Sequence, residues 1–443
     1  MSLLNPGHRL FGRARELQQL RSLQGNDILI QATGLGGGFG LTSLARAFAA
    51  EKIGKFPDGF IEVNLGGDPR HPRPVPVVDI QRKILGLLAP ELNRPEDPKS
   101  VRQHYRATLS NKHALLLLDD AVSTTQVHQL LPREALSRAI VTSHVDLSAH
   151  LPQLPLCRVG GLESSAARQL LGHLSPSTAS FGSRTLSKLV IFLEGNPLAL
   201  RLLASVLERT DARALRRVLR ELAQAKQVAA ALLDPNFPVT AVDIALELAY
   251  RHLDDEDLKA LEALAVMPAP FSGALAAAVW NLPEEKAISR LHHLVQAGLI
   301  EHYPESALYE LHSAVQHFAE TLLLGQGDFA REVTTRYVIY VLREAVRDIA
   351  ILDPRQRISE PVDRYLLWDH LPVAWRRALG DAPGWPTLSG LERWIRDLGV
   401  HGYPLLSVLL PPSEQRTWLQ AAASAAEVLG DMHAREVLRQ RLD

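Results

Sequence analysis

The first 160 residues alternate short, mainly apolar runs with longer segments in which apolar residues recur every three or four positions. The short runs are typical of strands buried on both faces, and the longer segments are typical of amphipathic helices. This alternation predicts a parallel sheet with crossover helices on its faces. The strands are expected at 28–32, 60–64, 114–118, 139–142 and 156–159.

Beyond residue 163 the helical spacing replaces the short runs. Amphipathic helices are expected at 166–173, 186–193, 197–208 and 212–226. Pro197 falls at a first helical turn, where the missing N–H of proline costs nothing. This part of the chain is therefore predicted to be helical, without strands.

The segment 241–324 begins with several short helical patterns and ends with two strand-like runs around a turn at 304–306. Helices followed by a small hairpin are typical of a winged helix. The remainder, 328–443, is again helical and is interrupted by proline clusters. No period of about 34 residues repeats three times, so a repeat array is not expected.

A glycine-rich stretch, GLGGGFGLTSLA, occupies residues 34–45 between the first expected strand and an expected helix. In a phosphate-binding loop with this context, backbone N–H groups and the helix N-terminus hold the phosphates. A lysine reaches the β- and γ-oxygens, and a Ser or Thr hydroxyl holds Mg²⁺. The candidate nucleotide-binding residues of this loop are Gly36, Gly38, Gly40, Leu41, Thr42 and Ser43.

The loop departs from the P-loop pattern at two points. Leu41 stands where the lysine belongs, and the interval from Gly34 to Gly40 is one residue longer than G-x-x-x-x-G. A charge-assisted hydrogen bond contributes about 1.5–3 kcal/mol, so its loss is expected to weaken triphosphate binding roughly tenfold to a hundredfold. Diphosphate binding is expected to suffer less, which favours ADP. The alternative is a flexible turn without a ligand.

An acidic pair follows a second apolar run, HALLLLDD, at residues 113–120. A buried parallel strand of this kind delivers Asp119 and Asp120 to the carboxyl edge of the sheet, where carboxylates bind Mg²⁺ and orient water. Acidic residues end many strands, so the pattern gains weight from the glycine loop before it. Any remaining catalysis is assigned to Asp119 and Asp120, and a magnesium ion to Thr42 and Asp119.

The predicted fold class is therefore multidomain α/β plus α. It comprises a P-loop nucleotide-binding α/β domain, a helical domain, a winged helix and a C-terminal helical domain. The expected boundaries are 1–160, 161–235, 236–325 and 326–443.

Composition narrows the classes of partner. Lys and Arg number 48 against 49 Asp and Glu, so no general attraction to nucleic acid or membrane is expected. The single cysteine excludes an intrachain disulfide and fits a reducing compartment. The purely apolar runs, such as 114–118, are too short to cross a bilayer, and no signal peptide is visible. The expected location is the cytoplasm.

Several motifs in order resemble the NB-ARC group of STAND nucleotide-binding switches, which includes plant disease-resistance proteins, apoptosome ATPases and bacterial regulators. The resemblance spans residues 10–324. It rests on the glycine loop and the acidic pair, and on four further stretches: LFGRARELQQL, SRAIVTSHVD, EGNPLAL and YELHSAVQHFA.

The resemblance implies roles for individual residues. Arg13 would lie by the adenine and Pro197 would pack on the base, while His312 would contact the diphosphate and lock the closed state. His144 stands in place of the sensor arginine, and Ser313 stands in place of the aspartate that follows the histidine. The expected lysine is thus replaced by Leu41 and the expected arginine by His144. The absence of both positive charges predicts little or no ATP hydrolysis. A competent ATPase would need another cation, such as Arg46 or Lys52.

The expected function is a signalling or regulatory switch, or a scaffold, that binds ADP or ATP weakly and acts through protein–protein contacts. No effector segment is recognisable before residue 10, so the expected output passes to a separate effector protein or to a second copy of the chain. One alternative is a nucleotide-free interaction module. Another is a transcriptional regulator that binds DNA with its winged helix; against it, the expected recognition helix, EEKAISRLHHLVQAG, is only mildly basic.

Overall fold

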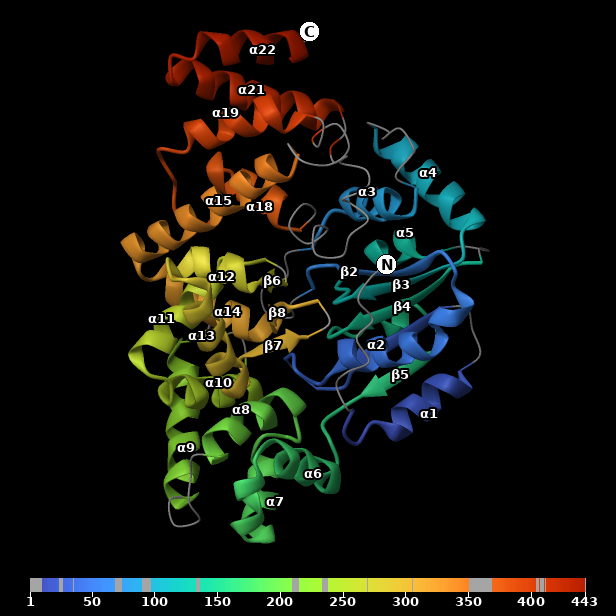
Figure 1. Ribbon diagram of the computed structural model, residues 1–443. Coiled ribbons are helices and arrows are strands. Elements are labelled where there is room, and N and C mark those ends of the chain that lie inside the picture. The colour runs from blue at the N-terminus through green and yellow to red at the C-terminus, as the bar shows by residue number, and fades with distance from the viewer. Residues whose placement is uncertain are drawn as a thin grey trace.

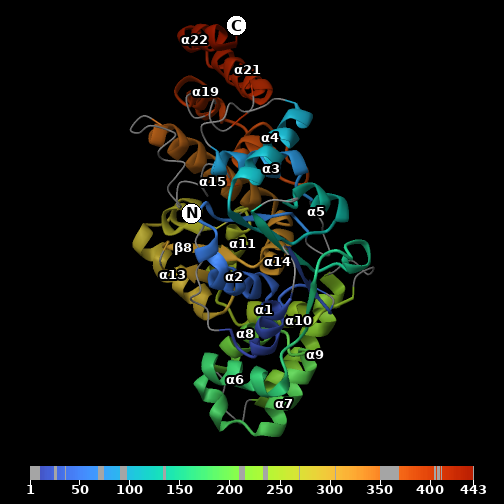
Figure 2. The same cartoon turned by 90° about the vertical axis from the view of Figure 1, so that its right-hand side faces the viewer.

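The computed structural model describes most of the chain. The described residues are 10–23, 27–34, 36–67, 74–89, 97–132, 136–208, 215–232, 238–268, 270–304, 306–349, 369–403, 406, 410 and 412–442. Figures 1 and 2 show an elongated molecule with α7 at one end and α22 at the other.

The N-terminal part contains a five-stranded parallel sheet in the order β2-β3-β4-β1-β5. All five predicted strands are confirmed, each with bounds within one residue of the expected ones. The apolar residues of these strands are buried, apart from the half-buried Leu156 of β5, because helices cover both faces of the sheet. The strands are β1 (Ile28–Ala32), β2 (Gly59–Asn64), β3 (Ala114–Asp119), β4 (Arg138–Ser143) and β5 (Leu156–Val159).

Successive residues of β3 divide between the two faces of the sheet. Leu115 and Leu117 pack with residues of α1 (Ala14–Ser22) and α2 (Leu41–Lys52). Leu116 and Leu118 pack on the opposite face, because side chains alternate along a strand. That face is covered by α3 (Val77–Leu88), α4 (Pro98–Asn111) and α5 (Thr124–Leu130).

Cys157 lies on β5, inside the apolar cluster that α1 and α2 cover. Burial raises the pKa of its thiol to about 11. The thiol is therefore protonated and shielded in the folded sheet.

The predicted helices after residue 163 are present, with bounds that differ by a few residues. The first half of the expected 212–226 helix lies partly outside the described residues. The helices are α6 (Ser164–Leu174), α7 (Ser183–Phe192), α8 (Pro197–Glu208) and α9 (Leu215–Leu232). The described residues of this part and of the α/β part also include the short 3-10 helices η1 (Ile53–Lys55), η2 (Ser148–His150) and η3 (Pro176–Ser180).

A small three-stranded antiparallel sheet, in the order β6-β8-β7, follows the helices. The predicted hairpin is confirmed as β7 and β8, whereas the assignment of this unit as a winged helix stays a prediction. The elements are α10 (Ala241–Arg251), α11 (Asp255–Leu264), β6 (Phe271–Ser272), α12 (Gly273–Trp280), α13 (Glu284–Gln296), β7 (Ile300–Tyr303), β8 (Leu308–Leu311) and α14 (Ser313–Leu324).

The C-terminal part is helical, as predicted. Trp375 and Trp418 stack in its interior with ring centroids 4.3 Å apart. Its described helices are α15 (Gly327–Ile349), α18 (Leu371–Ala378), α19 (Glu392–His401), α21 (Pro412–Val428) and α22 (Met432–Leu442). None of the helices in the described ranges is long and apolar enough to span a bilayer.

The buried apolar residues form separate clusters in the two halves of the molecule. One cluster runs from Leu162 to Leu438 and joins the helical, hairpin and C-terminal parts into a single packed body, hereafter the helical body. The two clusters of the sheet comprise residues up to Val159. Among the described residues, no apolar cluster extends from the α/β part into the helical body.

Candidate functional site

The glycine-rich loop connects β1 to α2 at the carboxyl edge of the sheet, as the sequence predicts. Gly36, Gly38 and Gly40 have φ angles of +81°, +84° and +79°. Side chains with a Cβ rarely adopt this left-handed region, whereas glycine enters it freely. The backbone path therefore requires glycine at these three positions, and Gly40 directly precedes the first turn of α2.

Leu41 is the first residue of α2 and is 2% exposed. It belongs to the apolar cluster that includes Phe39, Leu44 and Ala45. The residue in the lysine position is thus part of the core beneath the loop, and it supplies no positive charge to an anion. Ser43, two residues further along α2, is partly buried.

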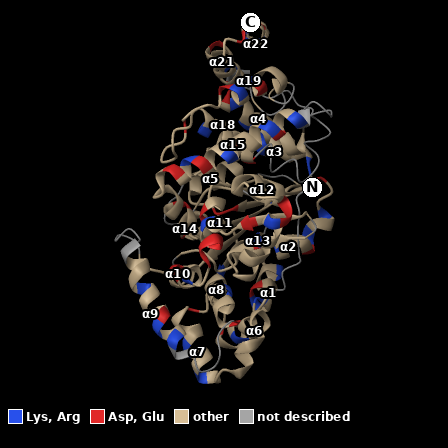
Figure 3. Cartoon of the chain, turned by 60° about the vertical axis from the view of Figure 1, so that its left-hand side comes forward, with Lys and Arg blue, Asp and Glu red and all other residues tan. Residues whose placement is uncertain are grey.

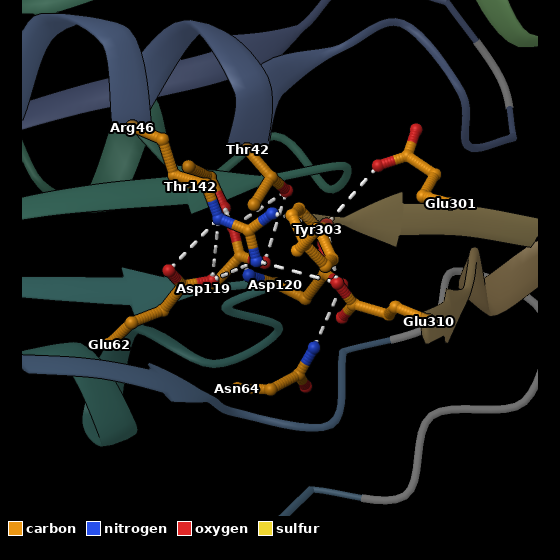
Figure 4. Close-up of polar contacts among 10 residues, drawn as sticks. All are labelled: Thr42, Arg46, Glu62, Asn64, Asp119, Asp120, Thr142, Glu301, Tyr303 and Glu310. Atoms are coloured by element: carbon orange, nitrogen blue, oxygen red, sulfur yellow. Dashed lines mark hydrogen bonds and ion pairs between the residues drawn. The ribbon is translucent and has the colours of Figure 1, made fainter. Parts of the chain in front are cut away.

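The structure brings together the two residues expected to hold magnesium. The Thr42 hydroxyl donates to the Asp119 carboxylate, with Oγ1 2.9 Å from Oδ1 and 3.0 Å from Oδ2 (Figure 4). Thr142 Oγ1 donates to Asp119 Oδ1 at 2.6 Å. Burial, followed by the charges of Asp120 and Glu62, raises the pKa of Asp119 to about 7. A hydroxyl and a carboxylate at hydrogen-bond distance are ligand types that fit Mg²⁺.

Asp120 lies beside His144, at the position where the resemblance predicts a sensor arginine. His144 Nε2 is 3.4 Å from Asp120 Oδ1, and the Asn64 amide donates to Asp120 Oδ2 at 3.3 Å. Asp120 also has a φ of +54°, a strained conformation for a residue with a side chain. The carboxylate is therefore held by residues at the ends of two strands flanking β3.

The turn that contains Pro197 sits directly on the glycine loop. Asn196 Nδ2 donates to the carbonyl oxygen of Gly37 at 3.0 Å, and the Leu198 N–H donates to that of Gly38 at 3.2 Å. Asn196 Oδ1 accepts from the N–H groups of Leu198 and Ala199, which caps α8. Pro197, the predicted base contact, begins α8 between these two loop contacts.

Two further segments cover the loop. A Cβ placed on Gly37 would lie 3.3 Å from His312 Cε1, and one on Gly36 would lie 2.9 Å from Thr240 Cγ2. His312 thus lies against the loop, and its predicted contact with a diphosphate stays a prediction. Its Nδ1 accepts from the N–H of Ala314 at 3.2 Å, so the histidine side chain caps α14.

Arg13 lies beneath the loop and is 4% exposed. Its Nη2 donates to the carbonyl oxygens of Phe39, at 2.8 Å, and Gly160, at 2.7 Å. Its Nη1 forms an ion pair with Glu16 at 2.8 Å. Arg13 therefore braces the loop against the end of β5; its predicted role beside an adenine stays a prediction.

Sequence reasoning missed a charged network around Arg46, one turn beyond Thr42 on α2. Arg46 Nη2 donates to Glu62 Oε1 at 2.7 Å, and Nη1 donates to the Tyr303 hydroxyl at 2.9 Å (Figure 4). The same hydroxyl donates to Glu310 Oε2 at 2.7 Å. Arg46 and Tyr303 are 257 residues apart, so no local pattern could pair them.

The structure shows what surrounds Arg46 and Lys52, the two alternative cations. Burial alone would lower the pKa of Arg46, but the charge of Glu62, with Tyr303 and Glu310, raises it well above its ordinary value. Burial also raises the pKa of the Glu310 carboxyl. Lys52, at the last residue of α2, lies over the Phe48 ring, 5.2 Å from its centroid. Arg46 is thus engaged with carboxylates.

Among the residues that the structure describes, no group of three or more His, Cys, Asp or Glu side chains is arranged to hold a metal ion. A magnesium ion at Thr42 and Asp119 would therefore need further ligands from phosphate oxygens or water.

Known proteins resemble this chain in sequence. No protein-family model matches it. A 352-residue stretch is 29% identical to the regulatory protein AfsR of Streptomyces griseus, covering 77% of this chain and 35% of the relative. A 305-residue stretch is 28% identical to AfsR of Streptomyces coelicolor, covering 67% and 30%. The chain spans about a third of the length of these curated relatives.

Solved structures resemble it in fold. A signal transduction ATPase with numerous domains (STAND) from Pyrococcus horikoshii, described as having a tetratricopeptide repeat sensor, superposes with a TM-score of 0.52. The match covers 98% of this chain and 64% of that one, at 16% identity. The chain has the STAND fold. The resemblance read from the motifs is thereby confirmed at the level of the fold, and the loop, the acidic pair and the covering segments all lie within this STAND fold.

Proposed function

We propose that the chain is a regulatory switch or scaffold of the NB-ARC type. It would bind ADP weakly at the glycine loop, hydrolyse nucleotide inefficiently, and act through contacts with another protein or a second copy. The regulatory role is supported by the similarity to AfsR, a regulatory protein in two Streptomyces species. In Figure 3, acidic and basic residues are interspersed along the chain, a distribution that suits a protein partner.

The observation that carries this proposal is the set of three segments converging on the loop. The backbone N–H groups of residues 36–40 and the hydroxyl of Thr42 would hold a diphosphate, and Asp119 with Thr42 would hold its Mg²⁺. Asn196 and His312 contact the same loop from the helical body. A ligand here would touch both halves of the molecule and so bias their separation.

Inefficient hydrolysis follows from the charges around the site. Developing charge on a transferred phosphoryl group needs fixed cations near it. Leu41 is buried and neutral, His144 lies against Asp120, and Arg46 is bound to Glu62. The surrounding carboxylates favour a bound Mg²⁺ over a bare triphosphate.

Nucleotide analysis of the purified protein tests the proposal. Denatured protein is expected to release ADP, and added ADP with Mg²⁺ is expected to raise the melting temperature of stripped protein. Thr42→Val should reduce that rise, whereas Thr335→Ala should leave it unchanged, because Thr335 is a half-buried threonine on α15 whose hydroxyl donates to the Arg331 carbonyl of the same helix. Protein that releases no nucleotide and shows no shift with millimolar ADP would overturn the proposal.

A nucleotide-free interaction module is the second candidate. It is favoured by the closeness of the loop's cover, since a Cβ on Gly38 would lie 2.7 Å from Leu198 Cβ. In that case side-chain packing alone holds the loop closed. The same titration separates the two candidates, because this module would show no shift with ADP while remaining fully folded.

A further inference from the structure

The contact between α2 and the β7–β8 hairpin joins two halves that share no apolar cluster among the described residues. The hairpin belongs to the helical body, and α2 belongs to the α/β part. What connects them at this point is polar: Arg46 against Tyr303 and Glu310. Polar contacts between domains separate at lower cost than a shared core, so this is a place where the molecule can open.

The hairpin carries an unfavourable pair of like charges. Glu301 on β7 is directly opposite Glu310 on β8 in the strand register. Like charges at opposed positions of an antiparallel pair repel each other and destabilise the hairpin. Both carboxylates are also partly withdrawn from water, since their side chains are 28% and 29% exposed. The isolated hairpin is thus poorly matched to its own charges.

Two arginines from different halves compensate this pair. Arg201 on α8 lies 2.5 Å from Glu301 Oε1, and it stays with the hairpin because α8 belongs to the helical body. Arg46 Nη2 lies 3.7 Å from Glu310 Oε2. The Tyr303 hydroxyl accepts from Arg46 and lies 2.7 Å from Glu310 Oε2 and 3.2 Å from Glu301 Oε2, so it bridges Arg46 and Glu310 and also contacts Glu301 (Figure 4). When the halves separate, Glu310 loses Arg46, whereas Glu301 keeps Arg201.

We propose that the β7–β8 hairpin is a latch that closes on α2 through Arg46, Tyr303 and Glu310, and that it holds the closed state without a nucleotide. On opening, Arg46 keeps Glu62 as its partner within the α/β part. Glu310 is left facing Glu301 without Arg46. The inference rests on the proposed regulatory role for its use, but the latch is independent of whether the loop binds ADP.

Hydrogen exchange of the full chain, stripped of nucleotide, tests the latch. Arg46→Gln is expected to speed exchange of the amides at 300–311 about tenfold or more, because a charge-assisted hydrogen bond between the halves is lost. Tyr303→Phe removes the bridging hydroxyl and leaves the Arg46–Glu62 pair in place, so it should speed exchange of the hairpin while exchange of β1 and β3 stays unchanged. The acceleration of exchange in the double variant should be smaller than the product of the two single-variant accelerations, because both substitutions break the same contact.

Arg21→Gln is the matched control. Arg21 also pairs with a glutamate, Glu51, but within the α/β part and at an exposed position, so hairpin exchange should not change. Unchanged exchange in both latch variants would overturn the proposal, and so would equal acceleration throughout the sheet. An effect of Tyr303→Phe that appears only with ADP present would overturn nucleotide independence. Absence of ADP binding, with the latch effects intact, would overturn the proposed nucleotide function alone.

Discussion

A single side chain at the start of α2 changes what the loop can do. A P-loop lysine there would place a positive charge at the phosphates, but Leu41 instead packs in the same apolar cluster as Phe39 and Ala45. At this position the chain therefore has apolar packing in place of a positive charge that would contact a ligand. The effect of this packing on the molecule is a stability contribution, which can be measured without knowing the ligand.

Leu41→Lys is expected to lower the free energy of unfolding by about 2–4 kcal/mol in nucleotide-free protein. The ammonium group would enter an apolar site and would also oppose the positive end of the α2 dipole. Leu41→Met, which conserves volume and polarity, should cost less than about 1.5 kcal/mol. Urea denaturation followed by circular dichroism measures both variants. Equal stability of the lysine variant and the wild type would show that the site accepts a charge.

Asp27, the residue directly before β1, is a partly buried carboxyl group at the edge of the sheet. Burial raises its pKa to about 6, although it accepts a hydrogen bond from the N–H of Ala139 at 2.7 Å. Because the folded pKa exceeds the unfolded value, its contribution is fully present below about pH 4 and is lost as pH rises toward 6. Asp27→Asn, which keeps the acceptor oxygen, should therefore match the wild type near pH 4.

At pH 8 the same variant should exceed the wild type in stability by up to about 3 kcal/mol. Denaturation series at pH 4, 6 and 8 measure the difference. Parallel stability curves for the two proteins across this range would contradict the assigned pKa.

At the scale of elements, predictability follows the range of the interactions. The strands could be located because burial on both faces writes a continuous apolar run into the sequence, as in β3. The glycine loop, Asp119 and His312 were accessible because each has a local motif. The network of Arg46 with Tyr303 and Glu310 was not, because it joins elements whose approach depends on how two separate bodies pack. Asn196 lay inside a recognised motif, but its amide contact with Gly37 depends on the same packing.

The seating of α8 on the glycine loop gives an element-scale prediction. Gly38→Ala and Gly40→Ala both place a side chain at positive φ, which costs about 1–2 kcal/mol. A Cβ at Gly38 would also lie 2.7 Å from Leu198 Cβ, whereas one at Gly40 meets nothing within 4 Å. Gly38→Ala should therefore cost about 1–3 kcal/mol more than Gly40→Ala.

Hydrogen exchange shows where that additional cost falls. Only Gly38→Ala should speed exchange at the first turn of α8, and both variants should leave α14 unchanged. Equal destabilisation by Gly38→Ala and Gly40→Ala would show that α8 moves away from the loop without a loss of stability.

At the scale of the whole molecule, the C-terminal helices reach back to α3, on the sheet face opposite α2 (Figure 1). Lys83 Nζ lies 2.5 Å from Asp369 Oδ1, and Arg82 Nη1 lies 3.0 Å from Glu414 Oε1. These pairs are partly exposed, and such pairs contribute little. The helical body is thus tied to the α/β part at several separate polar contacts, of which these are expected to be the weaker.

Lys83→Glu is expected to cost about 1 kcal/mol or less, and adding Asp369→Lys should recover the loss by restoring opposite charges. Urea denaturation of the single and double variants measures the coupling at low salt, and the difference should shrink at high salt. A loss of more than about 3 kcal/mol would identify the α3 contact, rather than the hairpin, as the main connection.

The burial of Cys157 makes the rate of thiol labelling a measure of local unfolding. It is the only cysteine of the chain, and a thiol-specific reagent reaches its sulfur only when α1 or β5 moves away from its neighbours in the folded sheet. Separation of the hairpin from α2 leaves β5 and α1 in place. The labelling rate of Cys157 therefore reports opening around α1 and β5 and does not report movement of the latch. It distinguishes a molecule that is switching from one that is unfolding.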